Sequence, residues 1–132
     1  MNAKKILVVE DDKVSQKLIS NILKSAGYEV FVAEDASTAV QIARAEDPDL
    51  ITLDVNLTVN SPDDAWDGFT VATWLRRVNE SKARPVIVVV SGMEPAKIIE
   101  KAASVGAYTL LPKPIEKQKL LDVVAEAIRH KH

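Results

Sequence analysis

Short apolar segments alternate with segments of helical periodicity five times along this chain, and this alternation limits the fold more than any other feature. Each apolar segment has the length and composition of a strand buried on both faces. The five segments are KKILVVE from residue 4, YEVFVA from 28, DLITLDV from 49, RPVIVVVSG from 84 and AYTLLP from 107. Strictly alternating strands and helices predict an α/β fold in which helices cover both faces of a parallel sheet.

The segments between the apolar runs have the periodicity and the end signals of helices. In the first, apolar residues recur from Val14 to Ala26, and Gly27 is well placed to end the helix. The second lies in DASTAVQIARAED and ends before Pro48. We expect three further helices, from about Phe69 to Asn79, around Pro95 to Ser104, and from Ile115 to about Arg129.

Composition limits the class of function. The chain has 132 residues, enough for one domain, and its 47% hydrophobic fraction is enough for a core at this size. A net charge of -2 argues against nonspecific binding to nucleic acid or to a membrane surface. The absence of cysteine excludes disulfides and thiol chemistry. No apolar run is long enough to span a membrane, and the N-terminus becomes acidic too early for a signal peptide. We therefore expect a single cytoplasmic domain over residues 1–132.

Polar residues gather at the predicted carboxyl ends of the strands, where open parallel sheets bind their ligands. They are Glu10, Asp11 and Asp12 after the first strand, Asp54 and Asn56 at the third, Ser91 and Gly92 at the fourth, and Lys113 after the fifth. With the strand order 2-1-3-4-5, the first and third strands are neighbours. The first acidic group then faces Asp54 across the point where the strand order reverses.

These residue types suit phosphoryl chemistry assisted by a hard divalent cation. Carboxylates, a backbone carbonyl and water are the ligands of Mg²⁺, which would also offset the repulsion between neighbouring carboxylates. Asp54 can act as a nucleophile and form an acyl phosphate. Lys113 supplies a compact positive charge for phosphoryl oxygens, and the Ser91 hydroxyl can donate to another of them. Asp12 fits the N-cap of the first helix better than a metal site.

The four motifs VVEDD, LITLDVN, VVVSG and LLPKPI closely resemble those of the receiver domain of two-component response regulators. They occur in the family's order, and the resemblance covers essentially the whole chain. It implies a flavodoxin-like (βα)5 fold with five parallel strands in the order 2-1-3-4-5. It also implies that Asp54 accepts the phosphoryl group, with Ser91 as the switch hydroxyl and Lys113 as the lysine that contacts the phosphoryl group.

The same resemblance implies a metal site and a signalling role. Glu10, Asp11 and Asp54, with the backbone carbonyl of Asn56, would bind Mg²⁺ or Mn²⁺. The phosphoryl group would come from a sensor histidine kinase, a phosphotransfer protein or a small donor such as acetyl phosphate. The implied protein is a switch and not an enzyme, apart from its own phosphoryl transfer and dephosphorylation. Its fourth helix, fifth strand and fifth helix would form the surface for an effector or for a phosphorylation-dependent homodimer.

The sequence departs from the family pattern at three places, of which the mildest is the switch hydroxyl, Ser91 where Thr is also common. The segment between Asp54 and Asp67 is longer than the family usually shows, which we interpret as a tolerated surface insertion. Trp66 within this segment argues against a fully solvated insertion, because tryptophan side chains usually pack against other residues. Leu110 stands where the family commonly has Tyr or Phe, with Tyr108 two residues earlier on the same predicted face.

Two other function classes stay open at this point. The segment DVNLT from Asp54 approximates the DxDxT motif of haloacid-dehalogenase-like phosphatases. However, Asn56 replaces the second Asp, and an amide cannot donate the proton that this chemistry needs. The other alternative is a receiver that works by binding alone, without phosphorylation. The complete set of acids, acceptor and lysine argues against it.

Overall fold

The computed structural model of the protein describes residues 3–54, 68–77, 85–92 and 94–129. Five parallel strands form one sheet in the order β2-β1-β3-β4-β5. The strands are β1 (Lys5–Val9), β2 (Glu29–Ala33), β3 (Leu50–Asp54), β4 (Val86–Ser91) and β5 (Thr109–Pro112). This arrangement confirms the predicted fold class, the strand order and the flavodoxin-like topology.

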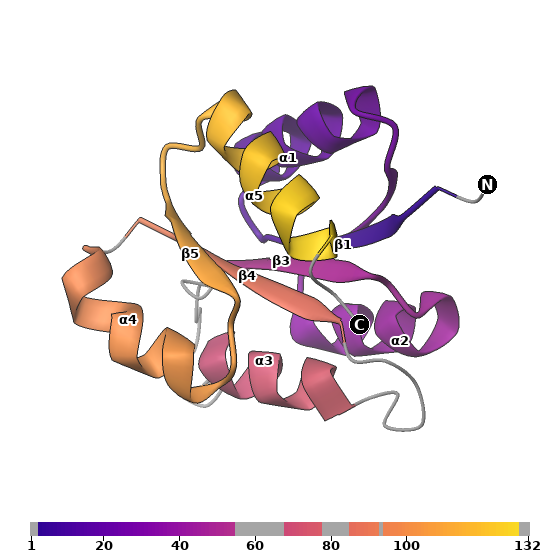
Figure 1. The fold of residues 1–132 in the computed structure, drawn as a ribbon. Coiled ribbons are helices and arrows are strands. Elements are labelled where there is room, and N and C mark those ends of the chain that lie inside the picture. Colours follow the sequence, from indigo (N-terminus) through magenta and orange to yellow (C-terminus); the bar gives the residue numbers. More distant parts are fainter. Residues whose placement is uncertain (1–2, 55–67, 78–84, 93, 130–132) are drawn as a thin grey trace.

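Each strand is followed by a helix, and the helices cover both faces of the sheet (Figure 1). They are α1 (Lys13–Ser25), α2 (Ala36–Glu46), α3 (Gly68–Arg77), α4 (Pro95–Ser104) and α5 (Lys117–Arg129). Helices α1 and α5 lie on one face, and α2, α3 and α4 lie on the other. Gly27 has a φ of 96° just after α1, a conformation that favours glycine, so it ends that helix as predicted.

Two predicted helix limits differ from the structure. The last helix begins at Lys117 and not at Ile115, because the Glu116 carbonyl accepts the first helical hydrogen bond, from the Leu120 N–H. Helix α3 begins at Gly68, one residue before the expected start, and the expected end at Asn79 lies outside the described residues.

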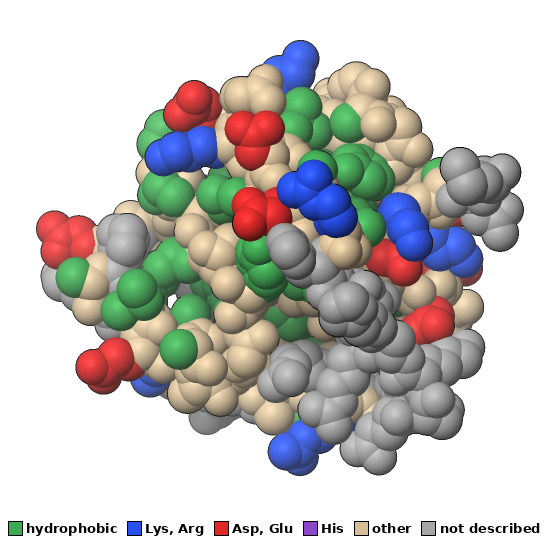
Figure 2. All heavy atoms as spheres, in the orientation of Figure 1, with side chains coloured by type: hydrophobic (Ala, Val, Ile, Leu, Met, Phe, Trp, Pro, Cys, Tyr) green, Lys and Arg blue, Asp and Glu red, His purple; other side chains and the backbone are tan. Residues whose placement is uncertain are grey.

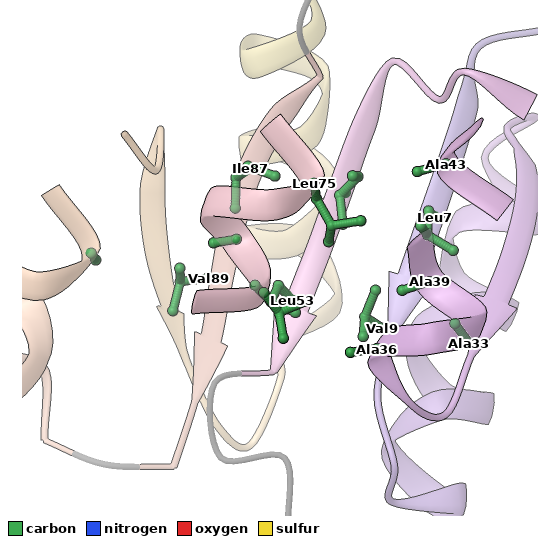
Figure 3. Close-up of a cluster of buried hydrophobic side chains, with 14 of the residues drawn as sticks. Leu7, Val9, Ala33, Ala36, Ala39, Ala43, Leu53, Leu75, Ile87 and Val89 are labelled. Atoms are coloured by element: carbon green, nitrogen blue, oxygen red, sulfur yellow. The ribbon is translucent and has the colours of Figure 1, made fainter. Parts of the chain in front are cut away.

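Alternation along the strands divides the core into two layers. Figure 3 shows the layer between the sheet and helices α2 and α3, with strand residues such as Leu7, Leu53 and Val89 facing alanines of α2 and Leu75 of α3. The alternate strand residues, including Ile6, Leu50 and Val88, belong to the layer beneath α1 and α5. The same alternation directs Asp54 and the residues level with it toward the α1–α5 side.

The surface agrees with the nearly balanced charge of the sequence. On the face drawn in Figure 2, acidic and basic side chains of the described residues are intermixed, and no broad basic area forms. Within the described part of the chain, no helix is both long enough and apolar enough to cross a membrane.

Candidate functional site

The strand register brings the predicted site residues to one edge of the sheet. Val9 lies level with Leu53, so Glu10 follows β1 at the level of Asp54, the last residue of β3. On the other side, Asp54 lies level with Val90, and Ser91 lies level with Pro112. Lys113 therefore leaves β5 at the same edge. Four separate strand ends meet here, as expected for parallel strands.

Three carboxylates form the acidic part of the site. Glu10, Asp11 and Asp54 each offer an oxygen within 4.8 Å of the others. Glu10 is 1% exposed and Asp54 3% exposed, whereas Asp11 is half-buried. Carboxylates held this close disfavour each other's ionised form unless a positive charge lies nearby. The cluster thus has the donor type and the spacing to bind a hard divalent cation.

Lys113 supplies one such positive charge. Its Nζ lies 2.7 Å from Oε1 of Glu10 and 3.2 Å from Oδ2 of Asp54. The contact with Asp54 is a hydrogen bond. The contact with Glu10 is an ion pair at Oε1, which makes no further hydrogen bond among the described residues. A buried carboxylate oxygen with spare acceptor capacity is what a metal ligand needs, so these residues fit a cation.

The ionisation of the site follows from this geometry. Burial raises the pKa of Glu10 to about 7, Asp54 acts in the same direction, and Lys113 opposes both. Burial also opposes the charge on Lys113. Its contacts with Glu10 and Asp54 outweigh that effect and hold its pKa above the usual value. Lys113 therefore stays protonated at neutral pH. Glu10 is the carboxyl group that would have to lose its proton for a metal ion to bind.

Asp12 lies outside this group, as predicted. Its carboxylate accepts a hydrogen bond from the Ser15 N–H at 2.9 Å and caps helix α1. The same hydrogen bond lowers the pKa of Asp12. Its own N–H donates to Oε2 of Glu10 at 3.3 Å. Asp12 thus helps to fix the strand end while its side chain serves the helix.

Of the remaining predicted site residues, the structure places Ser91 but does not describe Asn56. Ser91 is fully buried at the end of β4, and its carbonyl accepts a hydrogen bond from the Lys113 N–H at 2.9 Å. The Lys113–Pro114 peptide bond is cis. Asn56 lies outside the described residues, and so does the insertion that contains Trp66.

Sequence reasoning missed one residue that supports the site. The Gln16 side-chain amide donates to the Glu10 carbonyl at 3.0 Å and ties helix α1 to the end of β1. Gln16 lies four residues after the N-cap, on the first turn of the helix. That spacing is the only signal in the sequence that could have indicated it.

Fold and site together define a doubly wound α/β protein with a carboxylate and lysine site at its topological switch point. The chain belongs to the response regulator receiver domain family, whose model matches residues 6–125. Receiver domains are the signalling switches of two-component systems, and phosphorylation is characteristic of them. This membership removes the basis for the phosphatase alternative.

Individual relatives agree with this assignment. The chain is 30% identical to a chemotaxis protein CheY of Treponema pallidum over 128 residues, which cover 95% of this chain and 83% of that one. It is 28% identical to the polar-differentiation response regulator DivK of Brucella anthropi, covering 92% and 93% of the two chains. Among solved structures, the chemotaxis protein CheY4 of Vibrio cholerae superposes with a TM-score of 0.83 at 27% identity, covering 96% and 99%.

Proposed function

We propose that this chain is the phosphoacceptor switch of a two-component phosphorelay, with Asp54 as the acceptor. The observation that carries the proposal is the position of the Lys113 ammonium, which contacts both Asp54 and Glu10 at the buried end of the sheet. A nucleophilic carboxylate, a cation for phosphoryl oxygens and a cluster of metal-binding acids are the parts that phosphoryl transfer to aspartate requires.

The proposed step is a direct displacement at phosphorus. An Asp54 carboxylate oxygen attacks the phosphorus of a phosphohistidine on a sensor histidine kinase or phosphotransfer protein. A new O–P bond forms and the P–N bond breaks, so the electron pair returns to the imidazole nitrogen. Lys113, already within 3.2 Å of an Asp54 oxygen, is placed to contact the negative phosphoryl oxygens. The product is an acyl phosphate on Asp54 and a free histidine on the donor.

Glu10, Asp11 and Asp54 would hold Mg²⁺ or Mn²⁺, with the Asn56 backbone carbonyl as the further ligand that the family resemblance implies. When bound, the cation neutralises charge among the carboxylates and the phosphoryl oxygens. Asp54 is buried and the neighbouring Asp11 is half-buried, so we expect a donor to reach Asp54 from the side of Asp11.

The switch itself would run through β4 and β5. Phosphorylation adds negative charge next to Lys113 and Ser91, whose backbones are joined by a hydrogen bond of 2.9 Å. A shift at these residues reaches the face formed by α4, β5 and α5, where an effector or a second phosphorylated copy would bind. Half-buried Leu110 packs against the core there, and Tyr108 is 41% exposed. We infer a single receiver domain over residues 1–132, acting in the cytoplasm.

The direct test is intact-mass spectrometry after incubation with acetyl phosphate, with and without Mg²⁺. We expect the wild-type chain to gain the mass of one phosphoryl group only when Mg²⁺ is present. Asp54→Asn should gain none, because an amide cannot form the acyl phosphate.

Asp12→Asn is the matched control, since it also neutralises one carboxylate at the edge but keeps an N-cap side chain on α1. It should take up the phosphoryl group as wild type does. Equal labelling of Asp54→Asn and wild type would show that the acceptor lies elsewhere. No labelling of wild type by acetyl phosphate or by any tested phosphohistidine donor would favour a receiver that works by binding alone.

A further inference from the structure

An exposed tryptophan and two exposed arginines line one cleft on the outer face of helices α2 and α3. Val40 and Arg44 of α2 and Trp74 and Arg77 of α3 line an open cleft of about 290 Å³. The Trp74 side chain is 52% exposed. We call these four residues the α2–α3 patch.

Trp74 lies at the edge of the buried side of α3, beside an exposed arginine. Val71, Ala72 and Leu75 are buried in the core beneath α3. Arg77 falls on the opposite side of the same helix, and Trp74, three residues before it, lies at the flank between Arg77 and the buried side. Val40 and Arg44 are four residues apart and share one side of α2. The two helices pack against each other on the same face of the sheet, so their outer sides form one continuous surface (Figure 1).

The patch is positively charged in a chain whose net charge is -2. Among the residues that the structure describes, neither Arg44 nor Arg77 takes part in an ion pair. Both arginines are exposed, and both line the same cleft as Trp74. Guanidinium groups bind carboxylates in a two-point geometry, and Trp and Arg are enriched among the residues that dominate protein–protein affinity.

We propose that the α2–α3 patch docks an acidic segment of a partner protein. An apolar side chain of that segment would cover Trp74 and Val40, and flanking carboxylates would pair with Arg44 and Arg77. The cleft is open and lies at the lower end of the size range of pockets that enclose small molecules, which is about 300–1,000 Å³. A side chain from a larger partner suits it better than an enclosed ligand.

The position of the patch makes it independent of the phosphoacceptor chemistry. It lies on α2 and α3, on the other side of the sheet from α1 and α5, and it contains none of the residues proposed to act on the phosphoryl group. A partner bound there leaves the carboxyl edge of the sheet accessible. We therefore expect the docked segment to remain bound both before and after phosphorylation of Asp54.

The test uses the full chain and a short blocked peptide in which glutamates flank a central phenylalanine. Binding is followed by amide chemical shifts in NMR and by the Trp74 indole signal. A peptide with lysines in place of the glutamates and one with alanine in place of the phenylalanine are the ligand controls. We expect only the glutamate–phenylalanine peptide to bind, with shifts confined to α2 and α3.

Variants test whether binding depends on the α2–α3 patch or on other exposed residues. Trp74→Ala and the double variant Arg44→Glu/Arg77→Glu should each weaken binding at least tenfold. Ile99→Ala, which truncates another exposed apolar side chain, and Lys117→Glu/Lys119→Glu, which reverses two exposed charges on α5, should leave it within twofold. All variants should accept a phosphoryl group from acetyl phosphate at the wild-type rate, so a failure of the phosphoacceptor proposal would be visible separately.

Three results would overturn the proposal. The first is equal binding of the acidic and basic peptides, or shifts centred away from α2 and α3. The second is equal binding of the glutamate peptide without phenylalanine, or of an oligonucleotide, which would make the patch a general anion site. The third is a wild-type dimer in sedimentation analysis that Trp74→Ala abolishes, because a second copy would then be the occupant.

Discussion

At the scale of single residues, Thr52 places a hydroxyl in the interior of the sheet. The side chain is 1% exposed and lies between Val8 and Val88 in the neighbouring strands. Its Oγ1 has no hydrogen-bond partner among the described residues. A buried hydroxyl without a partner lowers stability, whereas an apolar group of the same shape does not carry that penalty.

We therefore predict that Thr52→Val raises the free energy of unfolding by about 1 kcal/mol, as measured by urea denaturation. Thr109→Val is the control, because Thr109 is only half-buried and its hydroxyl is not among the buried atoms that have no hydrogen-bond partner. That variant should change stability by less than about 0.5 kcal/mol. A loss of stability in Thr52→Val would mean that the hydroxyl has a partner in solution.

Glu10 gives the site a pH dependence with a defined sign. Its pKa is raised from 4.5 to about 7 by burial in the folded chain, so the folded state binds more protons than the unfolded state between these values. The contribution of Glu10 to stability without a divalent cation must then fall as the pH rises from about 4.5 to about 7. We expect the effect of this one group to be about 1–3 kcal/mol.

The measurement is urea denaturation across this pH window in the presence of a chelator. Glu10→Gln cannot ionise, so its stability should exceed that of wild type progressively as the pH rises. Titrating groups distant from Glu10 are the same in both proteins and cancel in the difference, which then reports Glu10 together with its neighbours Asp54 and Lys113. A constant difference between Glu10→Gln and wild type across the window would contradict the raised pKa.

At the scale of elements, two aspartates begin two helices in the same way. Asp12 accepts from the Ser15 N–H at 2.9 Å, and Asp35 accepts from the Thr38 N–H at 2.8 Å. We predict that Asp12→Ala and Asp35→Ala each cost about 1 kcal/mol in the free energy of unfolding.

Phosphorylation distinguishes a cap from a metal ligand at Asp12. Both alanine variants should still gain one phosphoryl group from acetyl phosphate, with the same Mg²⁺ requirement as wild type. If Asp12→Ala needed much more Mg²⁺ than Asp35→Ala, Asp12 would have to be counted among the groups that hold the cation.

The elements also show what the sequence could and could not predict. Continuous apolar runs such as Val86–Val90 locate buried parallel strands, because both faces of such strands lie in the core. The strand ends then locate Asp54, Ser91 and Lys113. The burial of the Glu10 carboxylate beside Lys113 could not be predicted, since it depends on the packing around a strand end. The exposure of Trp74 could not be predicted either, because a helical period shows which residues share a side but not which neighbours cover that side.

At the scale of the whole molecule, the acidic site lies at one edge of a closely packed three-layer α/β/α fold, so cation binding should stabilise the entire domain. A ligand that binds only the folded state adds about 2.7 kcal/mol at a hundredfold excess over its Kd. We predict that Mg²⁺ raises the Tm of wild type at neutral pH and that Asp11→Asn loses most of this increase.

Glu46→Gln is the matched control for this effect. Glu46 is an acidic residue at the end of α2, paired with Lys5 at the amino edge of the sheet and away from the cluster. Its neutralisation should leave the Mg²⁺-dependent rise in Tm unchanged. An equal loss in both variants would mean that Mg²⁺ acts on the overall charge of the protein and not at the proposed site.

The central claim is that one carboxylate, Asp54, receives the phosphoryl group, although Asp11 lies in the same cluster and Asp12 follows it. The most direct measurement is borohydride reduction of the phosphorylated chain, which converts an aspartyl phosphate to homoserine, followed by peptide sequencing by mass spectrometry. We predict homoserine at position 54 alone, and none when Mg²⁺ is removed. Homoserine at position 11 or 12, or a phosphoryl group that cannot be reduced in this way, would contradict the account.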